Sequence, residues 1–156
     1  MATTVTPATL TVTITEAVTL NGVDQGGSYA QTIASVTEVD RRIVEVPTSE
    51  IIILTFQATN PGSGTFDEAD VRYVRITNLD DTNFIQLIFR SENSNECAHK
   101  LDAGHSFILG ADNSAGVVDI HDASASALTV SFDDLVDITA LADTAACDLE
   151  YFVAGV

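Results

Sequence analysis

The sequence predicts an all-β fold, an antiparallel β-sandwich of jelly-roll-like type with about eight to ten short strands. Residues 9–15 alternate strictly between threonine and aliphatic side chains, which is the period of a strand with one buried face. Short apolar segments recur about every ten residues with turn residues between them, a spacing typical of sandwiches and barrels. No amphipathic segment longer than about two helical turns is present.

In the first third of the chain, strands are expected at residues 9–15, 41–46 and 50–59. Turns are expected at Asn21-Gly22, which readily adopts positive φ, and at residues 60–64. Residues 29–39 fit either a strand or an irregular connection. The aliphatic side chains of the first strand are expected to face the core: Leu10, Val12 and Ile14.

Residues 71–89 are predicted to form a central hairpin, with two apolar strands around a polar turn at residues 78–83. In its first strand, Tyr73 and Arg75 are expected on one face, with Val74 and Ile76 on the other. Residues 90–100 are polar and are predicted to form a loop. Later strands are expected near residues 105–109, 117–120, 128–132, 136–140 and 149–153.

The length of 156 residues fits one domain with a substantial core. Residues 1–8 are small and threonine-rich and are predicted to form a flexible N-terminal arm. Residues 9–156 are assigned to a single β-sandwich domain. Cys97 and Cys147 lack zinc-site spacing, so we expect free thiols or, alternatively, one disulfide formed outside the cell.

The chain has 23 acidic and 6 basic residues and a formal net charge of −17. This charge argues against nucleic acid and anionic membranes as partners, because both are bound through clustered Lys and Arg. No secretory signal and no apolar run of about 20 residues is visible, so a soluble protein made in the cytoplasm is expected.

No catalytic signature is present, and we predict that the protein is not an enzyme. A metal site from His99, His105 and Asp102 matches no known ligand spacing, so solvated loop histidines are the favoured interpretation. Acidic groups at residues 67–70, 80–81 and 133–137 suit calcium chemically, but no EF-hand frame is present. We therefore predict no metal site and no cofactor.

Five arginines carry nearly all of the positive charge, and in so acidic a chain they are expected to pair with internal carboxylates or to line an interface. The alternative is exposed arginines with weak surface pairs. The candidate interface residues are Arg41, Arg42, Arg72, Arg75 and Arg90.

Three segments resemble structural proteins of tailed-bacteriophage virions of the marine and cyanophage type: YVRITNLDDTN at 73–83, LDAGHSF at 101–107 and DLEYFV at 148–153. The short motifs at residues 14–16 and 20–22 also fit such chains. The chain departs from that pattern at Ala103, where proline is usual. The resemblance implies a non-enzymatic β-sandwich that packs in many copies on a head or tail, with no catalytic residues to carry over.

The expected function is therefore that of a virion structural protein, either a capsid-decoration (cement) protein or a tail-associated subunit. It would be made in the host cytoplasm and would bind the major capsid protein or other virion proteins and further copies of itself. One alternative is a tail-tube or filament-forming subunit that polymerises by strand addition. Another is a carbohydrate- or calcium-binding β-sandwich module.

Overall fold

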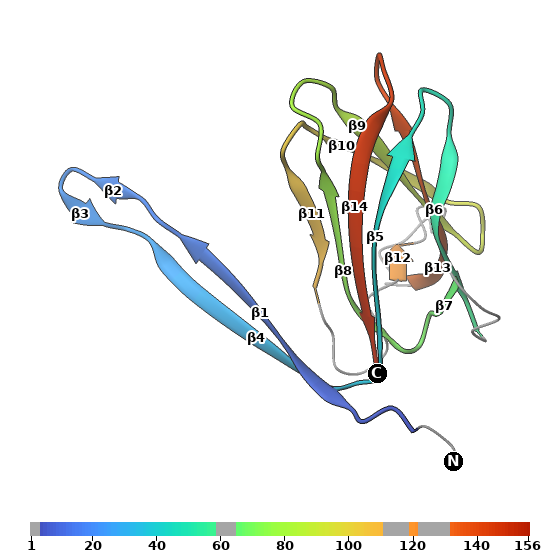
Figure 1. The fold of residues 1–156 in the computed structure, drawn as a ribbon, viewed down its shortest axis with the longest axis horizontal. Helices are drawn as coiled ribbons and strands as arrows, with labels where there is room; N and C mark the ends of the chain where they lie inside the picture. The colour runs from blue at the N-terminus through green and yellow to red at the C-terminus, as the bar shows by residue number, and fades with distance from the viewer. Residues whose placement is uncertain (1–3, 59–64, 111–118, 122–131) are drawn as a thin grey trace.

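The computed structural model describes residues 4–58, 65–110, 119–121 and 132–156, which form β-strands joined by turns and loops (Figure 1). No helix occurs within these ranges. In chain order the strands are β1 (Ala8–Glu16), β2 (Thr19–Leu20), β3 (Val23–Asp24), β4 (Gly27–Val36), β5 (Glu38–Val46), β6 (Ile51–Gln57), β7 (Thr65–Asp67), β8 (Val71–Asn78), β9 (Ile85–Ser91), β10 (Glu96–Leu101), β11 (Ser106–Leu109), β12 (Asp119–His121), β13 (Phe132–Ala142) and β14 (Cys147–Gly155).

Strands β5 to β14 form two sheets, which we call the body. One sheet has the order β11-β8-β14-β5, and the other has the order β10-β9-β13-β6, with β7 parallel to β6 at its edge and β12 paired with β13. Antiparallel pairs nest along the chain: β5 with β14, β6 with β13, β8 with β11, and β9 with β10. Nested pairs shared between two sheets are the topology of a jelly roll, so the predicted fold class is confirmed.

The core lies between the two sheets and follows from the alternation of side chains along each strand. In β14, Leu149, Tyr151 and Val153 point inward and are almost fully buried. Alternate residues of β8, which neighbours β14 in the same sheet, and of β9, in the opposite sheet, belong to the same core cluster. Val74 and Ile76 of β8 face this core and Tyr73 faces away from it, so the predicted division of β8 into two faces is confirmed. Further buried residues of this cluster are Ile85, Leu87, Ile138 and Ala140.

The predicted hairpin at residues 71–89 is wrong, because β8 and β9 belong to different sheets. β8 pairs with β11 and β14, whereas β9 pairs with β10 and β13. The polar segment at residues 79–84 is thus a connection that crosses from one sheet to the other. Its backbone is folded by Asp80, whose carboxylate accepts hydrogen bonds from the amides of Thr82 (2.8 Å) and Asn83 (2.6 Å).

The predicted loop at residues 90–100 is also wrong, because it holds the end of β9 and most of β10. β10 is an edge strand, and of its six residues only Leu101 is buried. A strand that buries so little needs no apolar alternation, which is why the sequence pattern missed it. Ser94, with φ of 63°, lies in the turn between the two strands, and its amide donates to the carbonyl of Ser91.

Strands β1 to β4 lie outside both sheets and form what we call the projecting hairpin (Figure 1). β1 pairs with β4 along its length, and the short strands β2 and β3 close the tip. The turn prediction is confirmed, because Asn21 and Gly22 have φ of 52° and 79°. The segment at residues 29–39, for which the sequence fits either a strand or an irregular connection, belongs mostly to β4 and β5, with Thr37 between them and a positive φ at Ser35.

Residues 9–156 are expected from the sequence to form one sandwich, whereas the two sheets of the sandwich begin at β5. Residues 4–7 have no regular secondary structure, and β1 begins at Ala8. The expectation that Ile14 faces the core is wrong, since its exposed fraction is 46%. A strand with one apolar face does not by itself indicate what covers that face.

Near the C-terminus, the predicted strands at residues 105–109, 136–140 and 149–153 are confirmed by β11, β13 and β14. The turn at residues 60–64 and most of the strand at residues 128–132 lie outside the described residues. Cys97 is exposed and Cys147 is buried, and both are free thiols. Within the described ranges, no helix is long and apolar enough to cross a membrane.

Candidate interaction surface

The projecting hairpin has two chemically different faces, because residues paired across the strands share a face. One face, which we call the apolar face, carries the pairs Leu10–Ile33, Val12–Gln31, Ile14–Tyr29 and Glu16–Gly27. The opposite face, which we call the hydroxyl face, carries the pairs Thr11–Thr32, Thr13–Ala30 and Thr15–Ser28. The hydroxyls of the last pair lie 3.2 Å apart. The alternation in the sequence therefore specifies this amphipathic ribbon.

The body covers only the base of the apolar face. Ile33 and Val36 are 2% and 5% exposed, and they form a small cluster with Tyr73 and Ala154. Tyr73 and Phe152 meet edge to face there, with ring centroids 6.0 Å apart. Four partly buried side chains surround this cluster: Leu10, Val12, Phe152 and Val156. The hairpin is thus anchored at one end by apolar packing on strands β8 and β14.

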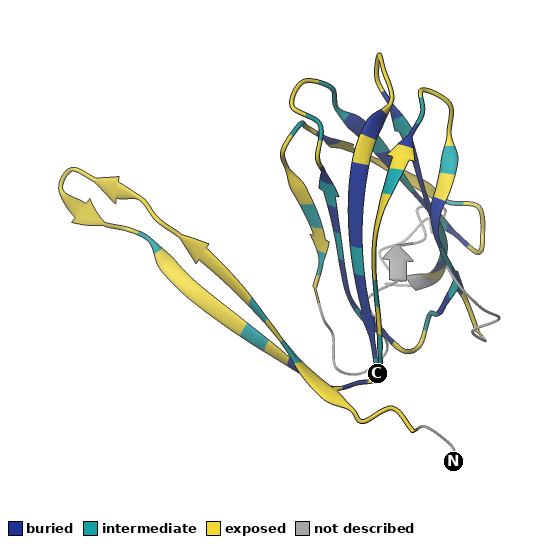
Figure 2. Ribbon diagram, viewed as in Figure 1, coloured by how far each residue is buried: buried dark blue, intermediate teal, exposed yellow. Residues whose placement is uncertain are grey.

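Beyond the base, the apolar side chains of the hairpin are open to solvent, and Figure 2 shows the outer part of the ribbon as almost wholly exposed. The Ile14–Tyr29 pair is 46% and 67% exposed. At the tip, the exposed apolar residues are Val18, Leu20 and Val23. Because an isolated two-stranded hairpin is marginally stable in water, this exposed apolar surface is a candidate for burial in an assembly.

The second part of the surface lies on the outer side of the sheet β11-β8-β14-β5, which we call the outer face. Two arginines donate hydrogen bonds to one carboxylate there. Arg41 donates to Glu150 through Nε (2.9 Å) and Nη2 (2.5 Å), and Arg75 donates to the other carboxylate oxygen at 2.6 Å. The Glu150 side chain is 8% exposed, whereas that of Arg41 is 66% exposed. Hydrogen bonds from Arg75, and to a smaller extent from Arg41, lower the pKa of Glu150.

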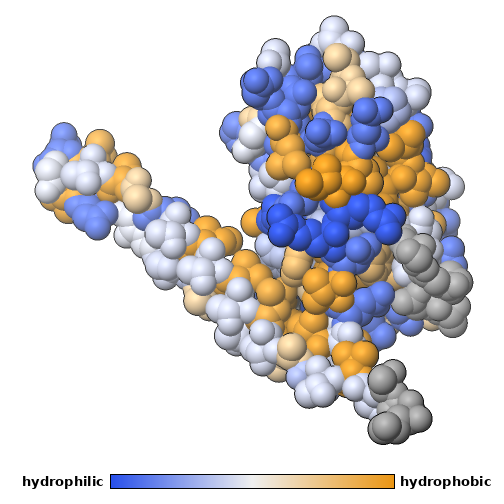
Figure 3. All heavy atoms as spheres, viewed as in Figure 1, coloured by the Kyte–Doolittle hydropathy of each residue, from blue (hydrophilic) through white to orange (hydrophobic). Residues whose placement is uncertain are grey.

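Apolar side chains flank this ion pair on the outer face. Ile43 and Val39 lie two residues on either side of Arg41 along β5 and are 59% and 56% exposed. Ile108 on β11 pairs with Arg75 and is 39% exposed. Figure 3 shows a hydrophilic band across the body with hydrophobic side chains on both sides of it. This face combines an exposed guanidinium group, that of Arg41, with exposed apolar surface.

The structure brings only two of the five candidate arginines together, namely Arg41 and Arg75. Arg72 donates to the backbone carbonyls of Ala69 (2.6 Å) and Val71 (3.2 Å). Arg42 lines a cavity of about 230 Å³ near Tyr151, between β5 and β6. Glu150 is not among the candidate residues, although a carboxylate inside the apolar strand at residues 147–155 was the available signal.

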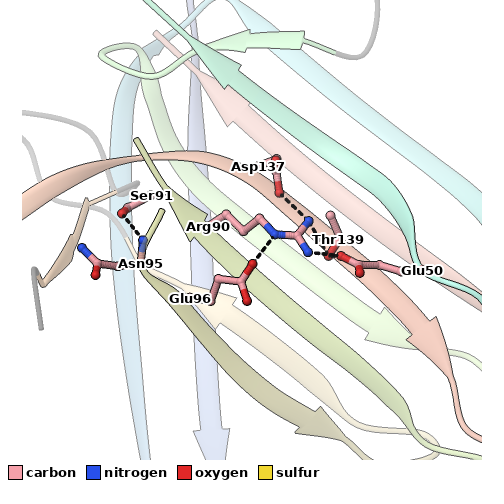
Figure 4. A network of polar contacts seen from close by, with 7 residues as sticks. All are labelled: Glu50, Arg90, Ser91, Asn95, Glu96, Asp137 and Thr139. Carbon is pink, nitrogen blue, oxygen red and sulfur yellow. Dashed lines mark hydrogen bonds and ion pairs between the residues drawn. The ribbon is translucent and has the colours of Figure 1, made fainter. Parts of the chain in front are cut away.

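Arg90 lies on the other sheet, in a separate polar network (Figure 4). It forms ion pairs with Glu50 and with Glu96, the latter at 2.7 Å, and Asp137 lies 3.6 Å away. The pKa of Asp137 is raised because burial disfavours its charged form more than Arg90 favours it. This arginine is occupied by internal carboxylates, as the paired interpretation of the sequence expected.

The residues weighed for metal binding make other contacts. His105 Nδ1 lies 2.8 Å from the carbonyl of Ala103, and Asp102 pairs with Lys100 at 2.6 Å. The His99 ring packs on Phe107, with centroids 4.8 Å apart. Among the described residues, no group of three or more His, Cys, Asp or Glu side chains is arranged to hold a metal ion.

The fold and this surface define an acidic jelly-roll protein with an anchored, projecting β-hairpin. No protein-family model matches the chain, and no curated protein sequence matches it.

Proposed function

We propose that this protein is a non-enzymatic structural subunit of a tailed-bacteriophage virion, bound in many copies as a capsid-decoration or tail-associated protein. The observation that carries the proposal is the projecting hairpin, whose apolar face is buried at Ile33 and exposed at Ile14 and Tyr29. An isolated hairpin is marginally stable in water, so the exposed part of this hairpin gains stability when a neighbouring molecule covers it. Repeated copies on a symmetric particle supply such neighbours.

The distribution of charge supports attachment through the hairpin. It holds only two of the 23 acidic residues, Glu16 and Asp24, and none of the six basic ones. The body carries the remaining acidic charge and would repel other acidic surfaces at close range. The hairpin can thus approach an acidic neighbour at a lower electrostatic cost than the body can.

The jelly-roll body supports the proposal at the level of fold, because viral structural proteins are among the proteins built on this topology. Fold alone does not assign function, and lectins share the same architecture. The resemblance of segments 73–83, 101–107 and 148–153 to phage virion proteins favours the virion class.

The test is to purify virus particles from cells that carry the gene and to quantify this chain by mass spectrometry. We expect the chain in the particle fraction, in copy numbers comparable to the major capsid protein or to a tail protein. Recovery only in the soluble cell fraction, with none in gradient-purified particles, would refute the proposal. Electron microscopy of the purified protein tests the alternative, because spontaneous tubes would indicate a tail-tube subunit.

A further inference from the structure

We propose that two copies of this chain form a reciprocal dimer, in which the apolar face of each projecting hairpin packs on the outer face of the other copy. This inference deepens the proposed function and rests on it for its biological setting. It concerns the partner that covers the hairpin, and that partner is a second copy.

The two surfaces match in chemistry. On the hairpin, the exposed Ile14–Tyr29 pair is followed on the same face by Glu16. On the outer face, the exposed Ile43 is followed two residues away by Arg41, whose side chain is 66% exposed. Apolar surface next to a carboxylate on one copy thus meets apolar surface next to a guanidinium on the other.

Between two copies, the charge pattern favours a contact of the hairpin with the body over a contact of one body with the other. Two bodies bearing most of the chain's −17 charge repel one another, whereas the hairpin brings only two carboxylates to the contact. On the outer face, the β5–β14 register places Glu45 and Asp148 beside the group formed by Arg41, Glu150 and Arg75, so the face as a whole is not positive. The Arg41 side chain stays 66% exposed while it pairs with Glu150, and it is the group on this face that a hairpin carboxylate can approach.

The area of the hairpin favours a reciprocal arrangement. From Ile14, where the body no longer covers the apolar face, to the turn at Asn21 the ribbon is about 25 Å long, and two strands are about 10 Å wide, so the free apolar face covers about 250 Å². A specific interface buries at least about 1,000 Å² in total. Two-fold exchange reaches about this area, because each copy contributes both its hairpin and its outer face and so buries about 500 Å².

The anchoring of the hairpin is consistent with exchange between copies. Its base is fixed on Tyr73 and Ala154, while the rest of the ribbon extends away from its own body (Figure 1). A hairpin held in this way presents Ile14 and Tyr29 to a neighbour without losing its own attachment. The cost of ordering the ribbon is then partly met before the dimer forms.

The test measures the mass of the purified full-length protein by light scattering and sedimentation across a concentration series. We expect a dimer for the wild type. Ile14→Asp on the apolar face and Ile43→Asp on the outer face should each weaken dimerisation by at least about tenfold. A monomeric wild type at all concentrations would overturn the proposal.

Two controls match these variants. Thr13→Asp changes the neighbouring position on the hydroxyl face, and Ile52→Asp changes an isoleucine of the other sheet that is 63% exposed. Both should leave the dimer intact. If Ile43→Asp is as harmless as Ile52→Asp, the hairpins contact something other than the outer face and the proposal fails. Thermal unfolding of each variant establishes that a loss of mass does not reflect a loss of fold.

Mixing the two variants makes the test specific for reciprocal contact. Ile14→Asp and Ile43→Asp homodimers each retain no intact contact, whereas the mixed dimer retains one intact hairpin on one intact outer face. We expect the mixture to associate more tightly than either variant alone, and no recovery would contradict the arrangement. A monomeric protein that is still abundant in particles would refute the dimer alone, and a dimer absent from particles would refute the proposed function alone.

Discussion

The side-chain amide of Asn78, at the end of β8 in one sheet, donates a hydrogen bond to the carbonyl of Leu101, at the end of β10 in the other sheet (3.2 Å). The same amide donates to the carbonyl of Asn83 (2.9 Å), and its oxygen accepts from the amide of Asp80 (3.0 Å). Asn78 is fully buried. One side chain therefore joins the two sheets and shapes the connection between them.

Replacing Asn78 with alanine is expected to lower the free energy of unfolding by about 2–4 kcal/mol. The change leaves the carbonyls of Leu101 and Asn83 and the amide of Asp80 without their partner in a site with little access to water. Urea unfolding at neutral pH measures the loss. Gln25→Ala, at an exposed position near the hairpin tip, is the control and should change stability by less than about 0.5 kcal/mol. Equal effects of the two changes would contradict this role for Asn78.

Asn78 also bears on why the sequence predicted the two strands within residues 71–89 but paired them wrongly as a hairpin. Alternation reports which residues of a strand face the core, and it predicted the faces of β8. It carries no information about which sheet a strand joins. Which sheet a strand joins depends on contacts with residues far along the chain, such as the hydrogen bond from Asn78 to Leu101, and a local pattern does not show such contacts.

The candidate surface was predictable in its parts and not in its assembly. The amphipathic pattern of β1 and the Asn21-Gly22 turn were evident in the sequence, and together they specify a hairpin. What the sequence did not show is that the body covers only the base of this hairpin. Likewise Arg75 was singled out, but its partner Glu150 lies 75 residues away and is brought near by β8–β14 pairing.

Asp137→Asn is expected to stabilise the protein at pH 7 by up to about 1 kcal/mol. Oδ1 of Asp137 is buried and accepts no hydrogen bond from the described residues, and burial raises the pKa of this carboxyl above its ordinary value of 3.8. A raised pKa means that the charged form of Asp137 disfavours folding. The contribution of this carboxyl to the free energy of unfolding of the wild type therefore falls as the pH rises above 3.8. The variant should therefore gain most near pH 7 and little below pH 3.8. Urea unfolding at several pH values tests this, and a gain that does not depend on pH would contradict it.

Glu150→Gln is expected to lower stability at pH 7 by about 1–3 kcal/mol, because Arg41 and Arg75 lose a charged acceptor. The lowered pKa of Glu150 means that its contribution is present above the ordinary value of 4.5 and is lost as pH falls through the folded-state value. The difference between variant and wild type should shrink as the pH is lowered. Glu96→Gln is the control, since the exposed Glu96 side chain makes a surface pair worth less than about 1 kcal/mol. A loss at Glu150 no larger than that at Glu96 would argue against a structural role for the ion pair.

Ser35 marks the point where the projecting hairpin bends onto the body, and its backbone controls how firmly the hairpin is held. β4 has one more residue than β1 between the pairs Ala8–Val36 and Leu10–Ile33, which is a bulge that turns both Ile33 and Val36 toward the body. Ser35 has φ of 61°, a conformation that costs a β-branched residue more than it costs serine.

Ser35→Val is therefore expected to loosen the base of the hairpin, whereas Ser35→Gly should keep it in place because glycine adopts positive φ without strain. Limited proteolysis measures the effect, and we expect Ser35→Val to speed cleavage within the hairpin several-fold while the body stays resistant. Ser28→Val, in the regular extended part of β4, is the matched control and should cleave at the wild-type rate, since valine suits an extended strand. If Ser35→Val and Ser28→Val are cleaved equally slowly, positive φ at this bulge does not determine the attachment of the hairpin.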